Sequence, residues 1–326
     1  MTLKEIGEQA VKGRLSLLRY WFDERAGTLM GLELHGVEPG RPYPASVMRA
    51  AEQIRMFHGT HLEHARTYIV PDEDVLTILD QDVRTFPTAT IYPSDMLSPD
   101  GFAYFARPIT HPVPEEGIPP VQAITWNVAG PDDPYFGTSD PDKYVISIIT
   151  YSAIRDIPEK AQFPDTLPRL YPTSSVLWRI GVEDGGEVWK DPETNRLTKR
   201  YREPPVKLLA AFFAIIRQRL LVLEETPTPL AKKVGHARRR YPRMESGVQV
   251  VRMRPRPERR YDRPPTERKL TKRFVVGSFW RWQWYPASEE NKPILIRPFE
   301  KGPAEAPLTG AHRVLAPAKP LGPKPR

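Results

Sequence analysis

Arginine dominates one stretch of the chain, and its chemistry there is that of anion binding. Nine arginines lie within 23 residues: Arg238, Arg239, Arg240, Arg243, Arg252, Arg254, Arg256, Arg259 and Arg260. The planar guanidinium group donates paired hydrogen bonds to a phosphate and keeps its charge at physiological pH. These residues predict a basic arm that contacts a nucleic-acid backbone. A solvated connector is the alternative interpretation.

Aromatic residues alternate with polar ones in a second stretch, SFWRWQWYP, from Ser278 to Pro286. In a strand, side chains alternate between the two faces, so the three tryptophans would share one face. Aromatic rings stack on bases, and Arg and Gln bind base edges. Large aromatics also fill cores, so one face could pack while the other binds. The predicted contact residues are Trp280, Arg281, Trp282, Gln283, Trp284 and Tyr285.

Three histidines at three-residue spacing, in HGTHLEH, suggest a metal by composition alone. On a helix, however, His58 and His64 lie about 240° apart, so all three cannot face one ion. His61 and His64 remain the pair that could share an ion. The chain lacks the His-Glu-x-x-His motif, a Walker loop and a dinucleotide fingerprint. We therefore predict no cofactor, and the catalytic residues of any enzyme are unknown.

The placement of charge indicates a polyanionic partner. Between Ala231 and Trp282 there are 17 basic and 4 acidic residues, a net charge of +13, whereas the whole chain carries +8. The remainder is therefore mildly acidic, at −5. Such asymmetry is typical of proteins that bind nucleic acids or anionic surfaces.

Cysteine is absent, which excludes disulfides and thiolate metal sites. The first residues, MTLKEIGEQAVKG, lack the apolar region of a signal peptide. The most apolar run, Leu208 to Ile216, is nine residues long, and a membrane span needs about 20. We therefore expect a cytoplasmic protein without a membrane partner.

Periodicity predicts an α+β fold whose elements must position these residues. We expect N-terminal helices over 1–66, then a core over 67–225 with a mostly antiparallel sheet of short strands and one buried helix over 205–224. A basic Arg/Pro-rich connector over 226–272, a C-terminal β-hairpin over 273–300 and a Pro-rich extended tail over 301–326 follow. The predicted strands cover 67–70, 75–79, 88–92, 102–109, 121–129, 144–154, 175–183 and 248–254. The 38 prolines favour turns between them.

The C-terminal region resembles a group of uncharacterised proteins from actinobacteria and their mobile elements. Their pattern is Val-x-Gly-His-Trp-Arg-x-Gln-x-Tyr, an aliphatic strand, and Lys-Gly-Pro-x-x-x-Pro-Leu. The matching residues are Val276, Trp280, Arg281, Gln283, Tyr285, Ile294, Leu295, Ile296, Pro298, Lys301, Gly302, Pro303, Pro307 and Leu308. Ser278 and Phe279 replace the usual Gly and His. The resemblance implies a phage, plasmid or actinobacterial context and no mechanism.

The leading hypothesis is a non-catalytic protein of a phage, plasmid or actinobacterial host that binds DNA or RNA through the basic arm and the aromatic strand. One alternative is a protein-interaction or structural component whose Pro-rich tail, from Pro303 to Arg326, binds a protein partner in extended form. Another alternative is a metal-dependent nuclease or toxin. It would use the area of His58, His61, Glu63 and His64, or an acidic loop with residues such as Asp72, Asp132 and Asp133, nearly all of which lie in turns where Asp is common.

Overall fold

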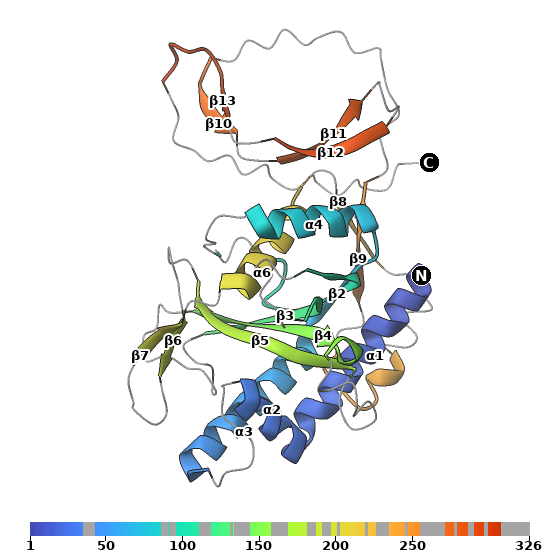
Figure 1. The fold of residues 1–326 in the computed structure, drawn as a ribbon, viewed down its shortest axis with the longest axis vertical. Coiled ribbons are helices and arrows are strands. Elements are labelled where there is room, and N and C mark those ends of the chain that lie inside the picture. The colour runs from blue at the N-terminus through green and yellow to red at the C-terminus, as the bar shows by residue number, and fades with distance from the viewer. Residues whose placement is uncertain are drawn as a thin grey trace. The chain divides into compact units, whose positions relative to one another are not determined.

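Helices and a seven-stranded, mostly antiparallel sheet make up the larger part of the fold, which confirms the predicted α+β class (Figure 1). By internal contacts the chain divides into two compact units, Met1–Ala214 with Leu223–Arg252, and Ile215–Val222 with Met253–Arg326. The computed structural model describes residues 1–34, 43–85, 91, 96–110, 119–130, 133, 144–157, 169–180, 187–190, 197–200, 203–218, 221–225, 235–244, 247–254, 271–276, 279–285, 290–296 and 299–307.

Three helices confirm the helical prediction for the N-terminal region: α1 (Leu3–Phe22), α2 (Glu24–Leu34) and α3 (Ala45–His64). A capping box starts α1. The Thr2 hydroxyl accepts the Glu5 N–H at 3.3 Å, and the Glu5 carboxylate accepts the Thr2 N–H at 2.7 Å. Together these bonds satisfy two of the N–H groups left unpaired at a helix start.

A corner at Asp23 separates α1 from α2. The Asp23 N–H donates to the carbonyls of Arg19 and Tyr20, which closes the end of α1. The Asp23 carboxylate then accepts the N–H of Ala26 at 2.8 Å, which caps the start of α2. One residue therefore ends one helix and begins the next.

The sheet has the order β5-β4-β3-β2-β1-β9-β8. The pairs β2–β3, β3–β4 and β4–β5 are antiparallel, whereas β1 pairs parallel with both β2 and β9. The strands are β1 (Arg66–Val70), β2 (Asp100–Ile109), β3 (Val121–Ala129), β4 (Val145–Ala153), β5 (Leu170–Arg179), β8 (Leu221–Glu225) and β9 (Val248–Met253). A short 3-10 turn, η2 (Ile154–Asp156), follows β4.

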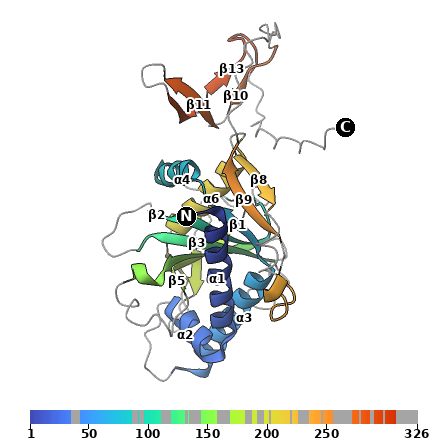
Figure 2. The same ribbon diagram turned by 90° about the vertical axis from the view of Figure 1, so that its right-hand side faces the viewer.

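Helices cover both faces of this sheet (Figures 1 and 2). On one face, Phe102 and Tyr104 of β2 lie in the buried cluster formed with α1, and the Tyr104 hydroxyl donates to Gln9 of α1 at 3.1 Å. On the other face, Phe105 of β2 contacts Phe212 of α6 (Glu203–Ile216), with ring centroids 6.1 Å apart. This alternation explains why the central strands are apolar along most of their length.

The strand predicted over 75–79 is wrong, because these residues belong to α4 (Glu73–Thr85). The Asp72 carboxylate accepts the Asp74 N–H at 3.0 Å and caps the helix. Buried Val75, Leu76 and Leu79 recur at helical spacing on the side that faces the sheet. The strand predicted over 88–92 lies outside the described residues except for Ile91.

The buried helix predicted over 205–224 ends earlier, because α6 stops at Ile216 and 221–225 form β8. The Gln218 N–H donates to the Ile215 carbonyl at 2.8 Å, which tightens the final turn. The Leu and Val residues of 221–225 are compatible with a helix or a strand, and pairing with the neighbouring β9 stabilises the strand. No helix among the described ranges is long and apolar enough to cross a membrane.

Short antiparallel pairs complete the described structure. Strands β6 (Glu187–Lys190) and β7 (Leu197–Arg200) form one pair. In the smaller unit, β10 (Phe274–Val276) pairs with β13 (Phe299–Lys301), and β11 (Phe279–Tyr285) pairs with β12 (Glu290–Ile296). The last pair is the antiparallel arrangement expected of the C-terminal hairpin. Residues 308–326 of the predicted tail lie outside the described residues.

Candidate functional site

The predicted arginines occupy three kinds of position. Arg238, Arg239, Arg240 and Arg243 are exposed on the segment 235–244, which we call the basic turn. On β9 and just after it, Arg252 is half-buried and Arg254 is exposed, and Arg252 lies 3.7 Å from the carboxylate of Glu224. Arg256, Arg259 and Arg260 lie outside the described residues.

The basic turn is folded against the larger unit. It begins with one helical turn, in which the N–H groups of Arg240 and Tyr241 each donate to the Ala237 carbonyl at 3.0 Å. Tyr241 and Met244 are 6% and 1% exposed and belong to the buried cluster that contains α1. Their burial fixes the intervening backbone, so the arginines project from a defined surface.

This part of the predicted 226–272 connector therefore has an apolar anchor. The Tyr241 ring stacks on Phe22 of α1, with centroids 6.0 Å apart and an interplanar angle of 20°. The N–H of Arg243 donates to the Glu63 carboxylate of α3 at 3.0 Å. The basic turn thus joins the ends of two helices that precede it by about 180 residues (α3) and about 220 residues (α1).

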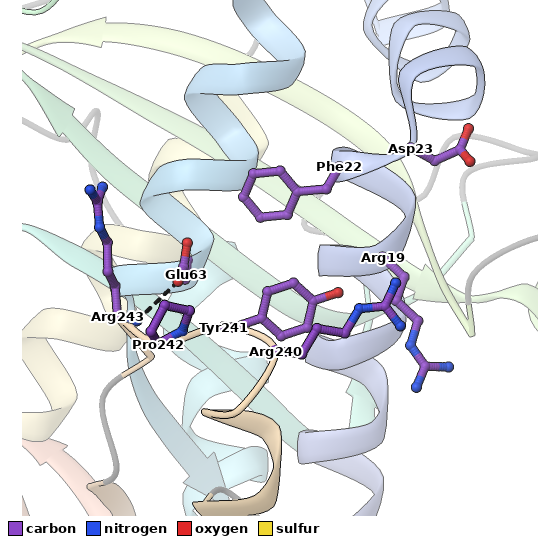
Figure 3. Close-up of a pocket in the computed structure, with 8 residues that line it drawn as sticks. All are labelled: Arg19, Phe22, Asp23, Glu63, Arg240, Tyr241, Pro242 and Arg243. Atoms are coloured by element: carbon purple, nitrogen blue, oxygen red, sulfur yellow. Dashed lines mark hydrogen bonds between the residues drawn. The ribbon is translucent and has the colours of Figure 1, made fainter.

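A pocket of about 490 Å³ opens where these three segments meet (Figure 3). The end of α1 contributes Arg19, Phe22 and Asp23, α3 contributes Glu63, and the basic turn contributes Arg240, Tyr241, Pro242 and Arg243. Three arginines thus border one cavity, with Arg19 and Arg240 on one side of the Phe22 and Tyr241 rings and Arg243 on the other (Figure 3).

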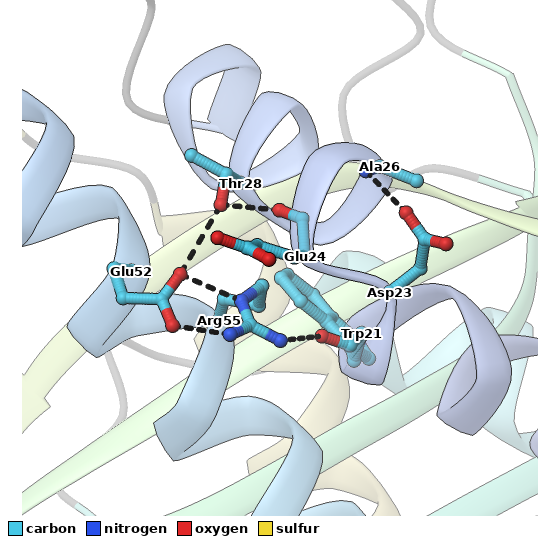
Figure 4. A network of polar contacts seen from close by, with 7 residues as sticks. All are labelled: Trp21, Asp23, Glu24, Ala26, Thr28, Glu52 and Arg55. Atoms are coloured by element: carbon cyan, nitrogen blue, oxygen red, sulfur yellow. Dashed lines mark hydrogen bonds and ion pairs between the residues drawn. The ribbon is translucent and has the colours of Figure 1, made fainter.

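The pocket has an excess of positive charge. Among the residues that the structure describes, no carboxylate lies within ion-pair distance of Arg19, Arg240 or Arg243. Asp23 also borders the pocket, but its carboxylate points away from the arginines and accepts the Ala26 N–H (Figures 3 and 4). Glu63 also borders the pocket, but its carboxylate accepts the backbone N–H of Arg243 and is not paired with a guanidinium group. The guanidinium groups are therefore available to an anion.

The titration of Tyr241 reflects the charges around its hydroxyl. Burial raises its pKa above the ordinary value of 10. The positive charges of Arg240 and Arg19 oppose that rise, and the negative charge of Glu63 adds to it. The Arg240 guanidinium carbon lies 5.8 Å from the centre of the Tyr241 ring. These interactions place both arginines within electrostatic reach of one hydroxyl.

Arg14 holds the end of α3 that carries Glu63. Its side chain is 1% exposed. The guanidinium donates to the carbonyl of Leu62 at 2.8 Å and 3.2 Å, to the carbonyl of Glu63 at 3.1 Å, and to the Thr67 hydroxyl. A cation at the carbonyl end of a helix also interacts favourably with the helix dipole. Arg14 therefore positions the Glu63 backbone beside the pocket.

A second buried arginine fixes the corner between α1 and α2 (Figure 4). Arg55 of α3 donates to both carboxylate oxygens of Glu52 and to the Trp21 carbonyl, the last at 3.3 Å. The hydrogen bond from Arg55 lowers the pKa of Glu52, despite partial burial. Thr28 of α2 donates to Glu52 at 3.3 Å and to the Glu24 carbonyl at 2.6 Å. Through the bond from Arg55 to Trp21, this network attaches the end of α1, which carries Arg19 and Phe22, to α3.

The aromatic stretch forms the predicted strand, β11, in the smaller unit. Trp280, Trp282 and Trp284 pair with Leu295, Pro293 and Asn291 of β12. The three tryptophans therefore occupy alternate positions, as a shared face requires. Gln283 is half-buried. The side chains of Trp280, Arg281, Trp282, Trp284 and Tyr285 lie outside what the structure describes, so their contacts with a ligand stay a prediction.

The two histidines proposed as a metal pair have different surroundings. His61 lies between two carboxylates, with Nδ1 2.7 Å from Asp100 and Nε2 3.4 Å from Asp133. His64 is the half-buried last residue of α3. Within the described part of the chain, no group of three or more His, Asp or Glu side chains is arranged to hold a metal ion.

Carboxylates on both sides determine how His61 titrates. Burial lowers its pKa, but the hydrogen bond and charge of Asp100, with those of Asp133, outweigh it and raise the pKa above 6.5. Asp100 is the first residue of β2, and the neighbouring Gly101 leaves room for the Trp126 ring. Trp126 donates its indole N–H to the Ser98 carbonyl at 2.9 Å. The arrangement joins α3 to the start of β2 and to the residues after β3.

Arg19, Phe22 and Tyr241 are site residues that the sequence does not predict. The sequence suggests Glu63 only as a member of a metal site with the neighbouring histidines, and not as part of an anion-binding pocket. A signal existed for Tyr241, because an aromatic residue within an arginine run is a natural anchor. The sequence offered no signal that joins α1, α3 and the basic turn.

Comparisons with known proteins leave the family of this chain open. No family model matches the sequence, and no curated protein matches it. A search of solved structures finds "Crystal structure of AcrVA2", with 10% sequence identity, a TM-score of 0.34, and coverage of 90% of this chain and 94% of that chain. At this TM-score the likeness does not establish a shared fold.

Proposed function

We propose that this chain is a non-catalytic nucleic-acid-binding protein of a phage, plasmid or actinobacterial host, and that the pocket beside the basic turn contacts the phosphate backbone. The observation that carries the proposal is the set of Arg19, Arg240 and Arg243 around one cavity, with no carboxylate of the described residues paired to them. Arg238 and Arg239 extend the same positive surface.

Concentrating positive charge in one place costs free energy. Guanidinium groups that border one cavity repel one another unless an anion lies between them. The fold nevertheless holds Arg240 beside Arg19, by burying Tyr241 and by the hydrogen bond from the backbone N–H of nearby Arg243 to Glu63. A phosphate binds such groups with paired, charge-assisted hydrogen bonds. Phosphates recur along a nucleic acid, so the exposed Arg238 and Arg239 would contact its neighbouring phosphates.

The aromatic strand β11 supplies a second contact in this proposal. Its alternating tryptophans suit the stacking of unpaired bases, which contributes about 1–3 kcal/mol per base. The proposal for the basic turn does not depend on it, because the two belong to different units of the chain.

The test is the salt dependence of binding. Binding of fluorescent single-stranded and duplex oligonucleotides is measured at several salt concentrations, for the wild type and for the Arg238→Ala, Arg239→Ala, Arg240→Ala triple variant. Each lost phosphate contact flattens the slope of log K against log salt by about 0.7 for single strands and 0.9 for duplexes, so three lost contacts flatten it by about 2 to 3.

A charge-matched control separates contact from net charge. Lys4, Arg49 and Arg155 are exposed cations on α1, α3 and η2, and replacing all three with alanine removes the same charge. Lys4 lies about 22 Å along α1 from Arg19 at 1.5 Å per residue. We expect the control to keep the wild-type slope. An unchanged slope in the basic-turn variant, or equal flattening in both variants, would refute the proposal.

A further inference from the structure

We propose that the pocket receives one guanine nucleotide of a single strand, with its phosphate on Arg19 and Arg240 and its base edge on Glu63. This inference rests on the proposed function and adds a base preference to it. It starts from the polarity of the pocket, which differs between its two ends.

The Phe22–Tyr241 pair separates these ends. In Figure 3, Arg19 and Arg240 lie on one side of the stacked rings, and Glu63 lies on the other side. A ligand that spans the rings therefore meets two cations at one end, and the Glu63 carboxylate together with the Arg243 side chain at the other. A nucleotide has this polarity, with an anionic phosphate and a base edge that carries N–H donors.

The size of the cavity favours one nucleotide over a duplex. A volume of about 490 Å³ lies within the range of small-ligand sites, about 300–1,000 Å³. Bases within a duplex are stacked and paired, so their Watson–Crick edges cannot reach an acceptor in a pocket. Bases of a single strand can turn outward and present those edges.

Glu63 determines which base fits. Glu63 is 8% exposed, and its carboxylate accepts the Arg243 N–H at 3.0 Å. A carboxylate has about four acceptor sites and no donor, so acceptor sites remain for a ligand. Arg14 fixes the backbone of Glu63 from behind, so the carboxylate has a defined position.

Guanine matches this acceptor better than the other bases. Its N1–H and N2–H donors lie side by side and can bind both oxygens of one carboxylate. Adenine and cytosine each offer an amino group beside a ring-nitrogen acceptor, which repels a carboxylate. Uracil and thymine offer one N–H between two carbonyls. A good bidentate contact discriminates between bases by about 5-fold or more.

The experiment measures binding by the fluorescence anisotropy of three labelled deoxyadenosine nonamers. Their central nucleoside is deoxyguanosine (the guanine strand), deoxyinosine (the inosine strand) or deoxyadenosine (the adenine strand). We expect the guanine strand to bind the wild type at least about 5-fold more tightly than the adenine strand, with the inosine strand between them because it lacks the 2-amino group. Glu63→Gln keeps an acceptor for the Arg243 N–H. It should reduce the guanine preference below about 2-fold without weakening the binding of the adenine strand, because the repulsion between the carboxylate and the adenine ring nitrogen is removed.

The outcomes separate this inference from the function on which it rests. If all three strands bind the wild type equally, the base preference is wrong, while a flattened salt slope in the basic-turn variant still supports nucleic-acid binding. If no strand binds, both are wrong. Displacement of the guanine strand by a phosphoserine peptide, but not by guanosine monophosphate, would also overturn the inference. The comparison of strands on the wild type needs no variant, so it decides the question even if Glu63→Gln does not fold.

Discussion

Replacing Arg14 with methionine should cost the larger unit much of its stability. Arg14 is 1% exposed, and its guanidinium donates to two carbonyls at the end of α3 and to the Thr67 hydroxyl. Methionine has a similar length and fills much of the same volume, so packing is largely kept. The substitution therefore removes the hydrogen bonds to the carbonyls of Leu62 and Glu63 and to the Thr67 hydroxyl with little change in packing.

The magnitude follows from the two carbonyls. A buried acceptor that loses its partner costs about 1–3 kcal/mol, so two cost about 2–6 kcal/mol. Removing the desolvated charge of Arg14 recovers part of this cost. We expect a net loss of about 3 kcal/mol in the free energy of unfolding. With an m-value near 3 kcal/mol per molar urea, the midpoint falls by about 1 M.

Urea denaturation followed by circular dichroism at 222 nm measures this loss, because nearly all the described helical residues belong to the larger unit. Lys12→Met is the matched control. Lys12 is exposed on the same helix, and its replacement should change the free energy by less than about 0.5 kcal/mol. A loss below about 1 kcal/mol for Arg14→Met, at an unchanged m-value, would show that these bonds do not hold the end of α3.

Two further predictions concern the region around the start of β2. The folded-state pKa of His61 is raised, so its contribution to stability is complete below about pH 6.5 and is lost as pH rises through the folded-state pKa. The stability difference between the wild type and His61→Gln should therefore shrink from pH 5.5 to pH 8.5 in thermal melts, and a difference that is constant or grows would contradict the pairing with Asp100 and Asp133. Gly101→Ala should lower stability by about 1–3 kcal/mol, since an added Cβ would overlap the buried Trp126 ring. Gly130→Ala, whose Cβ would lie 3.1 Å from the nearest atom of Tyr144, serves as its milder control, and equal melting temperatures for the two variants would argue against the overlap.

The regular elements were predictable where local pattern and tertiary environment agree. The strands over 102–109 and 121–129 are apolar runs between turn residues, and both are buried as that pattern suggests. The prediction of a strand over 75–79 is wrong because five residues are too few to show the helical spacing of buried apolar residues, which continues to Val83. The Asp72 cap before it was visible in the sequence and identifies a helix start.

The candidate site was predictable only in part. Arg240 and Arg243 follow from composition, because clustered arginines indicate an anion whatever the fold. Glu63 and Arg19 do not, because their place beside the basic turn depends on contacts across about 180 to 220 residues that no local pattern encodes. The base contacts of Trp280, Trp282 and Trp284 stay a prediction on a strand whose backbone is as expected.

The position of β1 has a consequence for how the chain is made. β1 is buried between β2 and β9, but β9 follows it in the sequence by about 180 residues. During synthesis, one edge of this apolar strand therefore stays unpaired until β9 has been made. At about 5–20 residues per second, a ribosome needs roughly 10–40 s to supply that neighbour. Unpaired strand edges are templates for aggregation. A shortened gene product that stops before Val248 would keep this edge open permanently, which makes it an unsuitable reagent for assays of the larger unit.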